Sequence, residues 1–272
     1  MIATTVNIEY KYGDTFTILP ISDIHLGNAT CDVKKLKADL EAHYTDKTLF
    51  IGVGDWLDML IVSDQKRYNK EHDATEGNDI IDQQIERCRE IFEPYKSGII
   101  GIGDGNHEEV ITRKCSTNPI KRLCAALSTE THPVIYLGYS WLLDVVFSEN
   151  GARARTLTIR GHHGWGGNSR TQGADITKYS HDVKFWRADL FLYGHVHKLK
   201  LDDIEEGRKV GKDGWKTFNK RMLVCGTYQR TYGEGTTATW AETKGFHPAK
   251  IAHPIVYATP LANGGVDIKS LV

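Results

Sequence analysis

The sequence predicts an α/β domain in which strands and helices form separate layers. Short apolar runs rich in Ile, Val, Leu and Phe alternate with amphipathic segments over most of the 272 residues, a pattern typical of layered α/β architecture. Each run closes on Gly, Asp or Asn, as buried strands do where they enter a turn. From about residue 221 the strand-like runs follow one another closely, so the C-terminal part is expected to be richer in β-structure.

The expected strands are short and rich in β-prone residues. In the first part of the chain they are Phe16–Ser22, Leu49–Val53, Ile99–Ile102, Leu157–Arg160 and Leu190–Tyr193. In the C-terminal part they are Arg221–Thr227, Pro254–Thr259 and Val266–Ile268.

Helical periodicity predicts three helices between these strands. The segment Asp32–Ala42 begins on an N-cap residue and carries its apolar residues on one face. The segment Asn78–Tyr95 is longer and shows the same spacing. The third helix is expected at Pro119–Leu127, where proline occupies the tolerated first turn.

Two polar stretches interrupt this alternation. Ser63–Gly77 is predicted to be a surface insertion, and Glu205–Trp215, which is charged and contains glycines, is predicted to be a hairpin tip. The sequence shows no repeat, low-complexity tract or linker, so residues 1–272 are interpreted as a single domain.

Composition excludes some classes of protein. Lys plus Arg (34) nearly balance Asp plus Glu (35), so no strong overall charge indicates a protein that coats nucleic acid. The five cysteines are odd in number and form no CxxC pair, which favours reduced thiols and a cytoplasmic protein. The N-terminus lacks the basic and apolar regions of a secretory signal. No apolar run approaches the roughly 20 residues of a membrane-spanning helix.

Five short motifs built from Asp, Asn and His follow the predicted strands. They are Asp23–His25, Gly54–Asp58, Gly105–Glu108, Gly161–Gly164 and Gly194–His197. Each motif alone has an ordinary interpretation as a turn, a strand end or a helix N-terminus. A metal centre assembled at the ends of neighbouring strands explains all five together, including their positions after strands.

The residue types match what a pair of divalent cations requires. Two ions about 3.5–4 Å apart need a bridging carboxylate, further carboxylate or imidazole ligands, and neutral oxygen ligands. Asp23 and His25 lie two residues apart, so at a strand end they are expected to point the same way, and His195 and His197 are expected to repeat that geometry. Mixed nitrogen and oxygen ligands favour Mn, Fe, Zn, Co or Ni over Mg and Ca, with Mn the first choice.

The motif order D-x-H, G-D-x-x-D, G-N-H-E, H-G and G-H-x-H resembles the calcineurin-like metallophosphoesterase superfamily, over the span from Asp23 to His197. The resemblance implies a four-layer α-β-β-α sandwich of two mixed sheets flanked by helices. For the first ion it implies the ligands Asp23, His25 and His197. Asp55 would bridge the two ions, and the second ion would be held by Asn106, His163 and His195.

The fourth motif contains two adjacent histidines, of which one is expected to be a ligand. Successive side chains of a strand point to opposite faces, so His162 and His163 cannot both reach the same ion easily. The family pattern places the histidine directly before glycine, which favours His163. His162 is then a candidate contact to the substrate or to a ligand.

The resemblance implies hydrolysis of a phosphoester by a hydroxide that bridges two metal ions. His107 would be the general acid and Asp58 would orient it, and the neighbouring Glu108 and Asp58 carboxylates are expected to raise the pKa of His107. Met59-Leu60 stands where phosphoprotein phosphatases of this superfamily have Arg-Gly. This difference favours a phosphodiesterase or nuclease. The alternatives are a phosphomonoesterase acting on nucleotides or other small phosphate esters and, more remotely, a metal-free interaction module.

The loop after His163 supplies candidate substrate contacts. Trp165 can stack on a base or sugar, and Arg170 can bind a phosphate. The alternative is a turn with an aromatic side chain packed on the core. The expected partner is a phosphate ester, with DNA or RNA as polymeric candidates, and neither a membrane nor an obligate protein partner is indicated. Gly233–Gly245 resembles the tail of small phosphoesterases encoded by phages and bacteria. The expected location is the cytoplasm, which would be the host cytoplasm if a phage encodes the protein.

Overall fold

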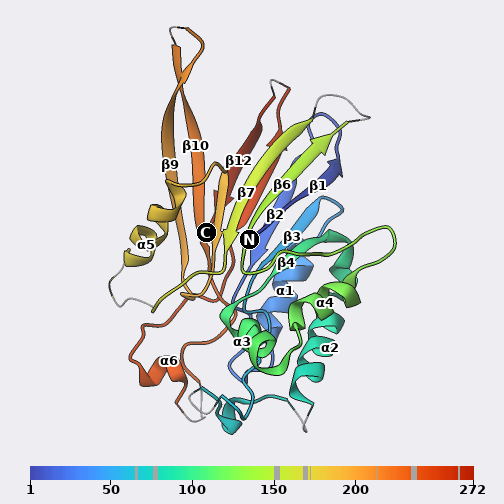
Figure 1. Ribbon diagram of the computed structural model, residues 1–272, viewed down its shortest axis with the longest axis vertical. Coiled ribbons are helices and arrows are strands. Elements are labelled where there is room, and N and C mark those ends of the chain that lie inside the picture. The colour runs from blue at the N-terminus through green and yellow to red at the C-terminus, as the bar shows by residue number, and fades with distance from the viewer. Residues whose placement is uncertain are drawn as a thin grey trace.

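The computed structural model describes residues 1–64, 67–75, 79–149, 154–167, 171, 173–212, 214–233, 238–262 and 264–272. Two mixed six-stranded sheets pack face to face, and helices cover their outer faces (Figure 1). The predicted α/β class and the four-layer arrangement of helices, sheet, sheet and helix are confirmed. Among the described residues, no helix is both long enough and apolar enough to cross a membrane.

The first sheet has the strand order β1-β6-β7-β8-β10-β9. Its strands are β1 (Ile2–Glu9), β6 (Ser140–Ser148), β7 (Arg155–His162), β8 (Leu190–Tyr193), β9 (Leu199–Val210) and β10 (Gly214–Cys225). The pairs β7–β8 and β8–β10 are parallel. β9 and β10 form a long antiparallel hairpin at one edge.

The second sheet has the order β12-β11-β2-β3-β4-β5. Its strands are β2 (Phe16–Ile21), β3 (Thr48–Val53), β4 (Ile99–Gly103), β5 (Ile135–Tyr136), β11 (Ile255–Pro260) and β12 (Val266–Leu271). The central strands β2, β3 and β4 run parallel, so their carboxyl ends lie at one edge of the sheet. β11 and β12 are antiparallel additions at the other side of β2.

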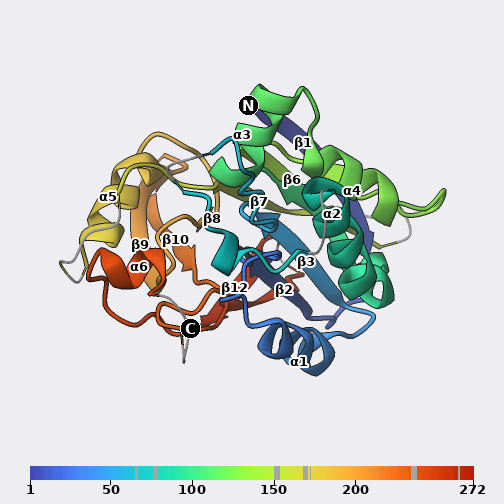
Figure 2. The same cartoon turned by 90° about the horizontal axis from the view of Figure 1, so that it is seen from below.

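The helices divide between the two outer faces, as Figure 2 shows. α1 (Val33–His43), α2 (Ile80–Phe92), α3 (Asn106–Cys115) and α4 (Pro119–Leu127) cover the second sheet, and α5 (Ala174–Val183) covers the first. Short helical turns occur at Lys70–His72, Glu93–Gly98 and α6 (Trp240–Thr243). As the sequence predicts, Asp32 caps α1 by accepting a hydrogen bond from Lys35 N.

Burial of apolar surface holds the layers together. The space between the sheets is filled from both sides, for example by Ile51 of β3, Val145 of β6 and Leu192 of β8. A second cluster lies between the second sheet and its helices, and a third places Tyr179 of α5 on the first sheet. These two packed sheets form the rigid base from which the loops of the site extend.

The structure contains several elements that the apolar runs do not predict. In β1 and β6 the buried side chains alternate with more exposed ones, so neither strand forms a continuous apolar run. α3 begins within the third motif, where polar ligand-type residues hide its periodicity. The segment Glu205–Trp215 is mostly the paired ends of β9 and β10 and not a loop, because Val210 already pairs with Gly214. The predicted hairpin is confirmed, and its turn is confined to the residues between Val210 and Gly214.

Candidate metal centre

The five motifs meet at one edge of the sandwich. The loops after β2 and β3 are joined by the hydrogen bonds from Asp23 N to Gly54 O and from His25 N to Asp55 O, each 3.0 Å long. The loop after β8 joins them because His195 N donates to Asp23 Oδ2 over 2.9 Å. Parallel neighbours in each sheet bring these strand ends to the same place, which is why residues far apart in the chain can share one site.

The ligand-type residues have an unusual backbone conformation. Seven non-glycine residues among those described have positive φ. Five of them belong to the motifs: Asp23 (51°), His25 (51°), Asp55 (50°), His195 (74°) and His197 (53°). Such residues cost roughly 1–3 kcal/mol each and occur mainly where the surrounding structure imposes them for function. Asp23 and His25 lie in one group of ligand-type residues, as their spacing predicts, although they lie in left-handed turns beyond β2 and not on an extended strand. The expectation that His195 and His197 repeat this geometry was wrong, because His197 lies with Asp23 and His25 whereas His195 lies with Asp55 and His163.

Asp23, His25 and His197, the first group, bring one carboxylate and two imidazoles together. His197 Nε2 lies 3.2 Å from Asp23 Oδ1 and 3.1 Å from His25 Nε2. Asp23 is fully buried, and its Oδ2 accepts a hydrogen bond from Ser22 Oγ at 2.5 Å. Ser22 and the His195 backbone thus orient the carboxylate so that Oδ1 faces the two imidazoles.

Asn106, His163 and His195, the second group, combine an amide with two imidazoles. Asn106 Oδ1 lies 3.2 Å from His163 Nε2 and 2.7 Å from His195 Nδ1. The other nitrogen of each ring has a backbone partner, with His163 Nδ1 2.8 Å from Val53 O and His195 Nε2 2.7 Å from Gly166 O. A carbonyl partner fixes which ring nitrogen carries the proton and leaves the opposite nitrogen as a ligand atom.

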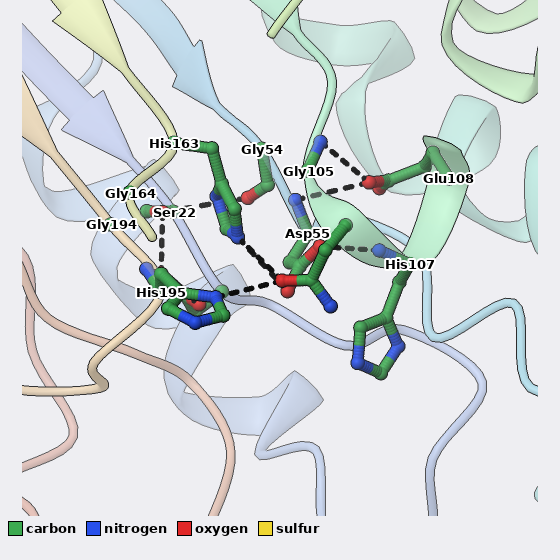
Figure 3. A network of polar contacts seen from close by, with 12 residues as sticks. Ser22, Gly54, Asp55, Gly105, His107, Glu108, His163, Gly164, Gly194 and His195 are labelled. Carbon is green, nitrogen blue, oxygen red and sulfur yellow. Dashed lines mark hydrogen bonds and ion pairs between the residues drawn. The ribbon is translucent and has the colours of Figure 1, made fainter. Parts of the chain in front are cut away.

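Asp55 lies between the two groups. Its Oδ2 is 3.8 Å from His25 Nε2 and 3.1 Å from His163 Nε2, while its Oδ1 accepts a hydrogen bond from His107 N at 3.0 Å. Figure 3 shows the Asp55 side chain directed toward His163 and flanked by His107. One carboxylate oxygen is therefore shared by the two groups, which is the position of a bridging ligand.

The residues present fit divalent transition-metal ions. Metal–nitrogen and metal–oxygen bonds of about 2.0–2.2 Å place neighbouring ligand atoms about 3 Å apart. Most separations within the two groups are close to this value, and the widest in the first group, from His25 Nε2 to Asp23 Oδ1, is 3.9 Å. Asp23, Asp55 and His163 are almost completely buried, so their charges need compensation from within the site. Imidazole, carboxylate and amide donors together suit Mn, Fe, Co, Ni or Zn.

Charge compensation also appears in the pKa values. Burial alone would lower the pKa of His163, but the charge of Asp55 and its hydrogen bond raise it to about 10. The pKa of His25 is likewise raised, because the Asp58 hydrogen bond and the Asp55 charge outweigh burial. Burial opposes ionisation of Asp55, yet the charges of His163 and His107 hold its pKa well below the usual range. Without metal, protons on these imidazoles balance the carboxylates.

Asp58 contacts His107 and His25 differently from the sequence prediction. His107 Nδ1 lies 2.5 Å from the backbone oxygen of Asp58, whereas Asp58 Oδ1 lies 3.3 Å from His25 Nδ1 and 3.7 Å from His107 Nδ1. The Asp58 carboxylate therefore orients a ligand-type histidine, and the Asp58 carbonyl orients His107. Asn28 holds the same carboxylate through a bond from Nδ2 to Oδ2 of 3.3 Å.

The expectation that neighbouring carboxylates raise the pKa of His107 was wrong. Burial lowers the pKa of His107 and the charge of His25 lowers it further, which together outweigh Asp55 and Asp58. Glu108 takes no part, because its side chain points away from His107 toward backbone N–H groups (Figure 3).

Glu108 is a supporting residue whose role the sequence does not indicate. It is fully buried and accepts hydrogen bonds from the backbone nitrogens of Asp55 (3.2 Å), Leu57 (2.9 Å) and Gly105 (2.9 Å). These bonds tie the loop after β3 to the start of α3. Burial and the charge of Asp55 raise the pKa of Glu108 to about 8, while the N–H donors favour its charged form.

Close packing leaves no room for side chains at two glycines of these loops. A Cβ on Gly105 would lie 2.0 Å from Asp55 Oδ1, and one on Gly54, whose φ is +91°, would lie 2.5 Å from His163 Nδ1. Trp56 holds the same loop against the core. Its side chain is fully buried, its ring stacks on that of Phe92 with a centroid distance of 4.5 Å, and its Nε1 donates a hydrogen bond to Ile21 O. The position of Asp55 between the two groups is thus held from several directions.

The predicted substrate contacts have different placements. His162 accepts a hydrogen bond from Gly164 N at 2.9 Å and lies edge-on to Trp165, whose ring also contacts Tyr179. Burial lowers the pKa of His162 to about 4. Trp165 retains 38% of its accessible surface, but the described cavity wall includes Gly166 and Gly167 and neither His162 nor Trp165. Arg170 lies outside the described residues.

A cavity of about 760 Å³ opens from the ligand-type residues. Its inner end is lined by His25, Asp55, Asn106, His107, His195 and His197. Its walls come from the described part of the predicted 63–77 insertion, including Arg67 and His72, and from a late segment that contains α6. From sequence, the first wall is marked only as a surface insertion, and the second only by the likeness of Gly233–Gly245 to the tail of small phosphoesterases.

Comparisons with known proteins give weak likenesses. No protein-family model and no curated protein sequence matches the chain. One similar solved structure is a predicted phosphoesterase from Streptococcus pneumoniae TIGR4, with 14% identity and a TM-score of 0.34 over 95% of this chain and 99% of that chain. A second is Vps29 with Zn²⁺ from Entamoeba histolytica, with 14% identity and a TM-score of 0.34 over 94% of this chain and 98% of that chain. A third is GAP50 of the Plasmodium inner membrane complex, with 8% identity and a TM-score of 0.45 over 94% of this chain and 84% of that chain. These TM-scores are too low to bear on function, which is inferred below from the site itself.

Proposed function

We propose that this protein is a dinuclear metal-dependent phosphoesterase of the calcineurin-like type that cleaves phosphodiesters. The observation that supports this most directly is Asp55 Oδ2, which lies within ligand-sharing distance of both His25 Nε2 and His163 Nε2. A buried carboxylate shared by two sets of ligand-type residues has little structural benefit without cations between them. It is the arrangement that a two-metal hydrolytic site requires.

Bound divalent ions would supply an activated water nucleophile and positive charge against the phosphoryl oxygens. The chain's own contribution is to hold the ligand atoms in fixed directions. The first group would hold one ion and the second group the other, with Asp55 common to both. The backbone partners of His163 and His195 keep the correct ring nitrogens facing inward.

His107 is the proposed general acid. Its Nδ1 faces the Asp58 carbonyl, which favours a proton on Nδ1 and directs Nε2 away from that contact. His107 lines the cavity beside the ligand-type residues, where the leaving oxygen of a bound ester would lie. A proton on Nε2 can therefore be given to that oxygen. Binding of cations nearby would lower the pKa of His107 further and make it a stronger acid.

The decisive experiment uses protein stripped with a chelator and then supplied with Mn²⁺. The substrates are bis-p-nitrophenyl phosphate and the corresponding monoester. We expect diester hydrolysis to return with the metal and to exceed monoester hydrolysis. Asp55→Ala should abolish it, whereas Asp46→Ala, which removes an exposed carboxylate elsewhere, should match the unchanged protein.

Each other result has a clear meaning. Hydrolysis of the monoester alone would replace the diesterase with a phosphomonoesterase. Folded protein that binds no metal would contradict the dinuclear site and favour an interaction module. Full activity in Asp55→Ala would remove the bridging role on which the proposal depends.

A further inference from the structure

We propose that the outer part of the cavity is a binding site for single-stranded nucleic acid, with a base stacked on Trp240 and backbone phosphates on Lys200 and Lys250. This inference rests on the proposed function for the inner end of the cavity. It adds a recognition site, the outer wall, formed by the start of β9 and by residues 238–250 around α6. In Figure 2, α6 lies on the same side of the molecule as β9 and β10.

The size of the cavity exceeds what one phosphate group needs. A volume of about 760 Å³ lies in the upper part of the roughly 300–1,000 Å³ range of sites that enclose whole organic ligands. The ligand-type residues occupy only its inner end. The remaining wall must therefore face other parts of the substrate.

The outer wall carries positively charged side chains. Lys200 and Lys250 line the cavity and form no ion pair with the described residues. Lys198 and Arg230 also line it, but they pair with Asp175 and Asp32. Among the side chains of the described lining residues, Asp73 carries the one carboxylate beyond Asp55 and Asp58, and the last residue, Val272, also lines the cavity. The wall thus favours an anion in addition to the phosphoryl group at the inner end.

An aromatic side chain is held on the same wall. Trp240 begins α6 and remains 60% exposed, with its ring 5.6 Å from that of Phe246. The helix is fixed by a capping box, in which Thr239 Oγ1 accepts from Glu242 N at 3.0 Å and Glu242 Oε2 accepts from Thr239 N at 3.3 Å. Ala249 N also donates to Thr231 Oγ1 at 2.9 Å. The local fold therefore presents the indole in a defined place.

These features together favour a strand with unpaired bases. A mononucleotide has one phosphate group, which would be held at the inner end, and would leave the two lysines without an anion. A longer strand supplies further phosphates to Lys200 and Lys250. Duplex bases are stacked on one another, so an indole on a wall can stack only on a base that is unpaired.

The binding test uses metal-free protein, so it does not depend on catalysis. The probe is a fluorescein-labelled oligothymidylate of about twelve nucleotides, within the usual site size of single-strand binders. Fluorescence anisotropy should show binding that weakens with salt. Trp240→Ala should weaken it by about 5- to 150-fold, the effect of losing one base–aromatic stack. Lys200→Ala should reduce the slope of log Kd against log salt by about 0.7–1.

Matched controls come from the β9–β10 hairpin. Trp215 is 72% exposed and Lys212 lies in the same turn region, and neither lines the cavity. Trp215→Ala and Lys212→Ala should leave oligonucleotide binding unchanged. A labelled duplex of equal length should bind more weakly than the single strand. Equal effects of Trp215→Ala and Trp240→Ala, or no effect of Trp240→Ala, would overturn the proposal.

The activity test separates this inference from the proposed function. With Mn²⁺ restored, Trp240→Ala should retain hydrolysis of bis-p-nitrophenyl phosphate and lose kcat/KM toward the oligonucleotide by a factor similar to its loss of binding. If the protein hydrolyses the small diester but Trp240→Ala loses nothing on the oligonucleotide, the recognition site is wrong and the esterase stands. If the protein hydrolyses neither substrate but metal-free binding depends on Trp240, the recognition site stands and the esterase is wrong.

Discussion

The two halves of the candidate metal centre, which are the first and the second group, differ in charge. The first group can offer an ion two carboxylates, Asp23 and the shared Asp55, together with two imidazoles. The second group offers only the shared carboxylate, with the neutral amide of Asn106 and two imidazoles. An ion in the first group is therefore attracted by about twice the formal negative charge, so it should bind first and more tightly. The second position is the one better suited to accept an anionic substrate, since less negative charge surrounds it.

The halves also differ in their outer support. In the first group, His25 is held by the charged Asp58 side chain, and His197 keeps 29% of its side chain exposed. In the second group, both imidazoles are held by neutral backbone carbonyls, and His163 is completely enclosed. A charged partner makes an imidazole more basic than a carbonyl does. The Asp58 carboxylate thus adds negative charge next to the first group, which already has more carboxylates than the second.

The largest effect is expected from His107, the neighbour of both halves. His107→Ala should lower kcat for the small diester by about 10²–10⁴-fold, the usual contribution of a general acid. Two metal ions should remain bound, as measured by elemental analysis after gel filtration. A loss of one ion in His107→Ala would instead make His107 a ligand, as its closeness to His25 and Asp55 permits.

Much of this comparison could be predicted from the sequence. Ligand types and their order along the chain follow from local patterns, so residues such as Asp23 and His163 can be named as candidate ligands without a structure. Their support cannot be recognised in this way, because it depends on distant backbone atoms, for example the Val53 carbonyl behind His163. The contact of the Asp58 carboxylate with His25 was missed for the same reason. Asp58 Oδ1 lies 3.3 Å from His25 Nδ1 and 3.7 Å from His107 Nδ1, and the sequence cannot indicate so small a difference.

The outer wall was harder to predict than the ligands. Trp240 lies in a segment marked only by its likeness to the tail of small phosphoesterases, and its place on the cavity depends on where the chain runs after the β9–β10 hairpin. The layered fold was predictable because its central strands are continuous apolar runs. β1 and β6 were not, because alternation of buried and exposed residues weakens the signal of a strand.

Metal affinity should depend strongly on pH in both halves. The pKa of His163 is about 10, so near neutral pH its ring carries an extra proton that a metal ion must displace. The pKa of His25 is also raised, which shifts its ring toward the protonated form. Affinity should therefore rise with pH, by about tenfold per unit for each proton released. Calorimetric titration with Mn²⁺ at three pH values, in buffers of different ionisation enthalpy, measures the metal affinity and the number of protons released. Affinity that is independent of pH, with no proton release, would show that these rings are neutral before the metal binds.

Asp58→Asn should affect the two halves unequally. Loss of the charged partner of His25 should weaken the tighter of two binding steps by about 10- to 100-fold, the usual effect of removing such a support. The rate at saturating metal should change much less. Asp73→Asn, a carboxylate change elsewhere on the cavity wall, is the matched control and should leave both binding steps unaltered. If the rate falls in Asp58→Asn while affinity is kept, its carboxylate serves His107 and not His25.

The smallest effect concerns Glu108, which supports Asp55 and therefore both halves at once. Glu108→Gln preserves shape but replaces one accepting oxygen with an NH₂ group that faces backbone donors. Leaving such a buried N–H group without an acceptor costs about 1–3 kcal/mol, so the free energy of unfolding of the metal-free protein should fall by that amount in urea denaturation. Both metal-binding steps should weaken together, because the displaced loop carries the shared ligand. If only one of the two metal-binding steps weakens, Asp55 serves mainly the ion of that step. Asp55 would then not be shared equally by the two groups.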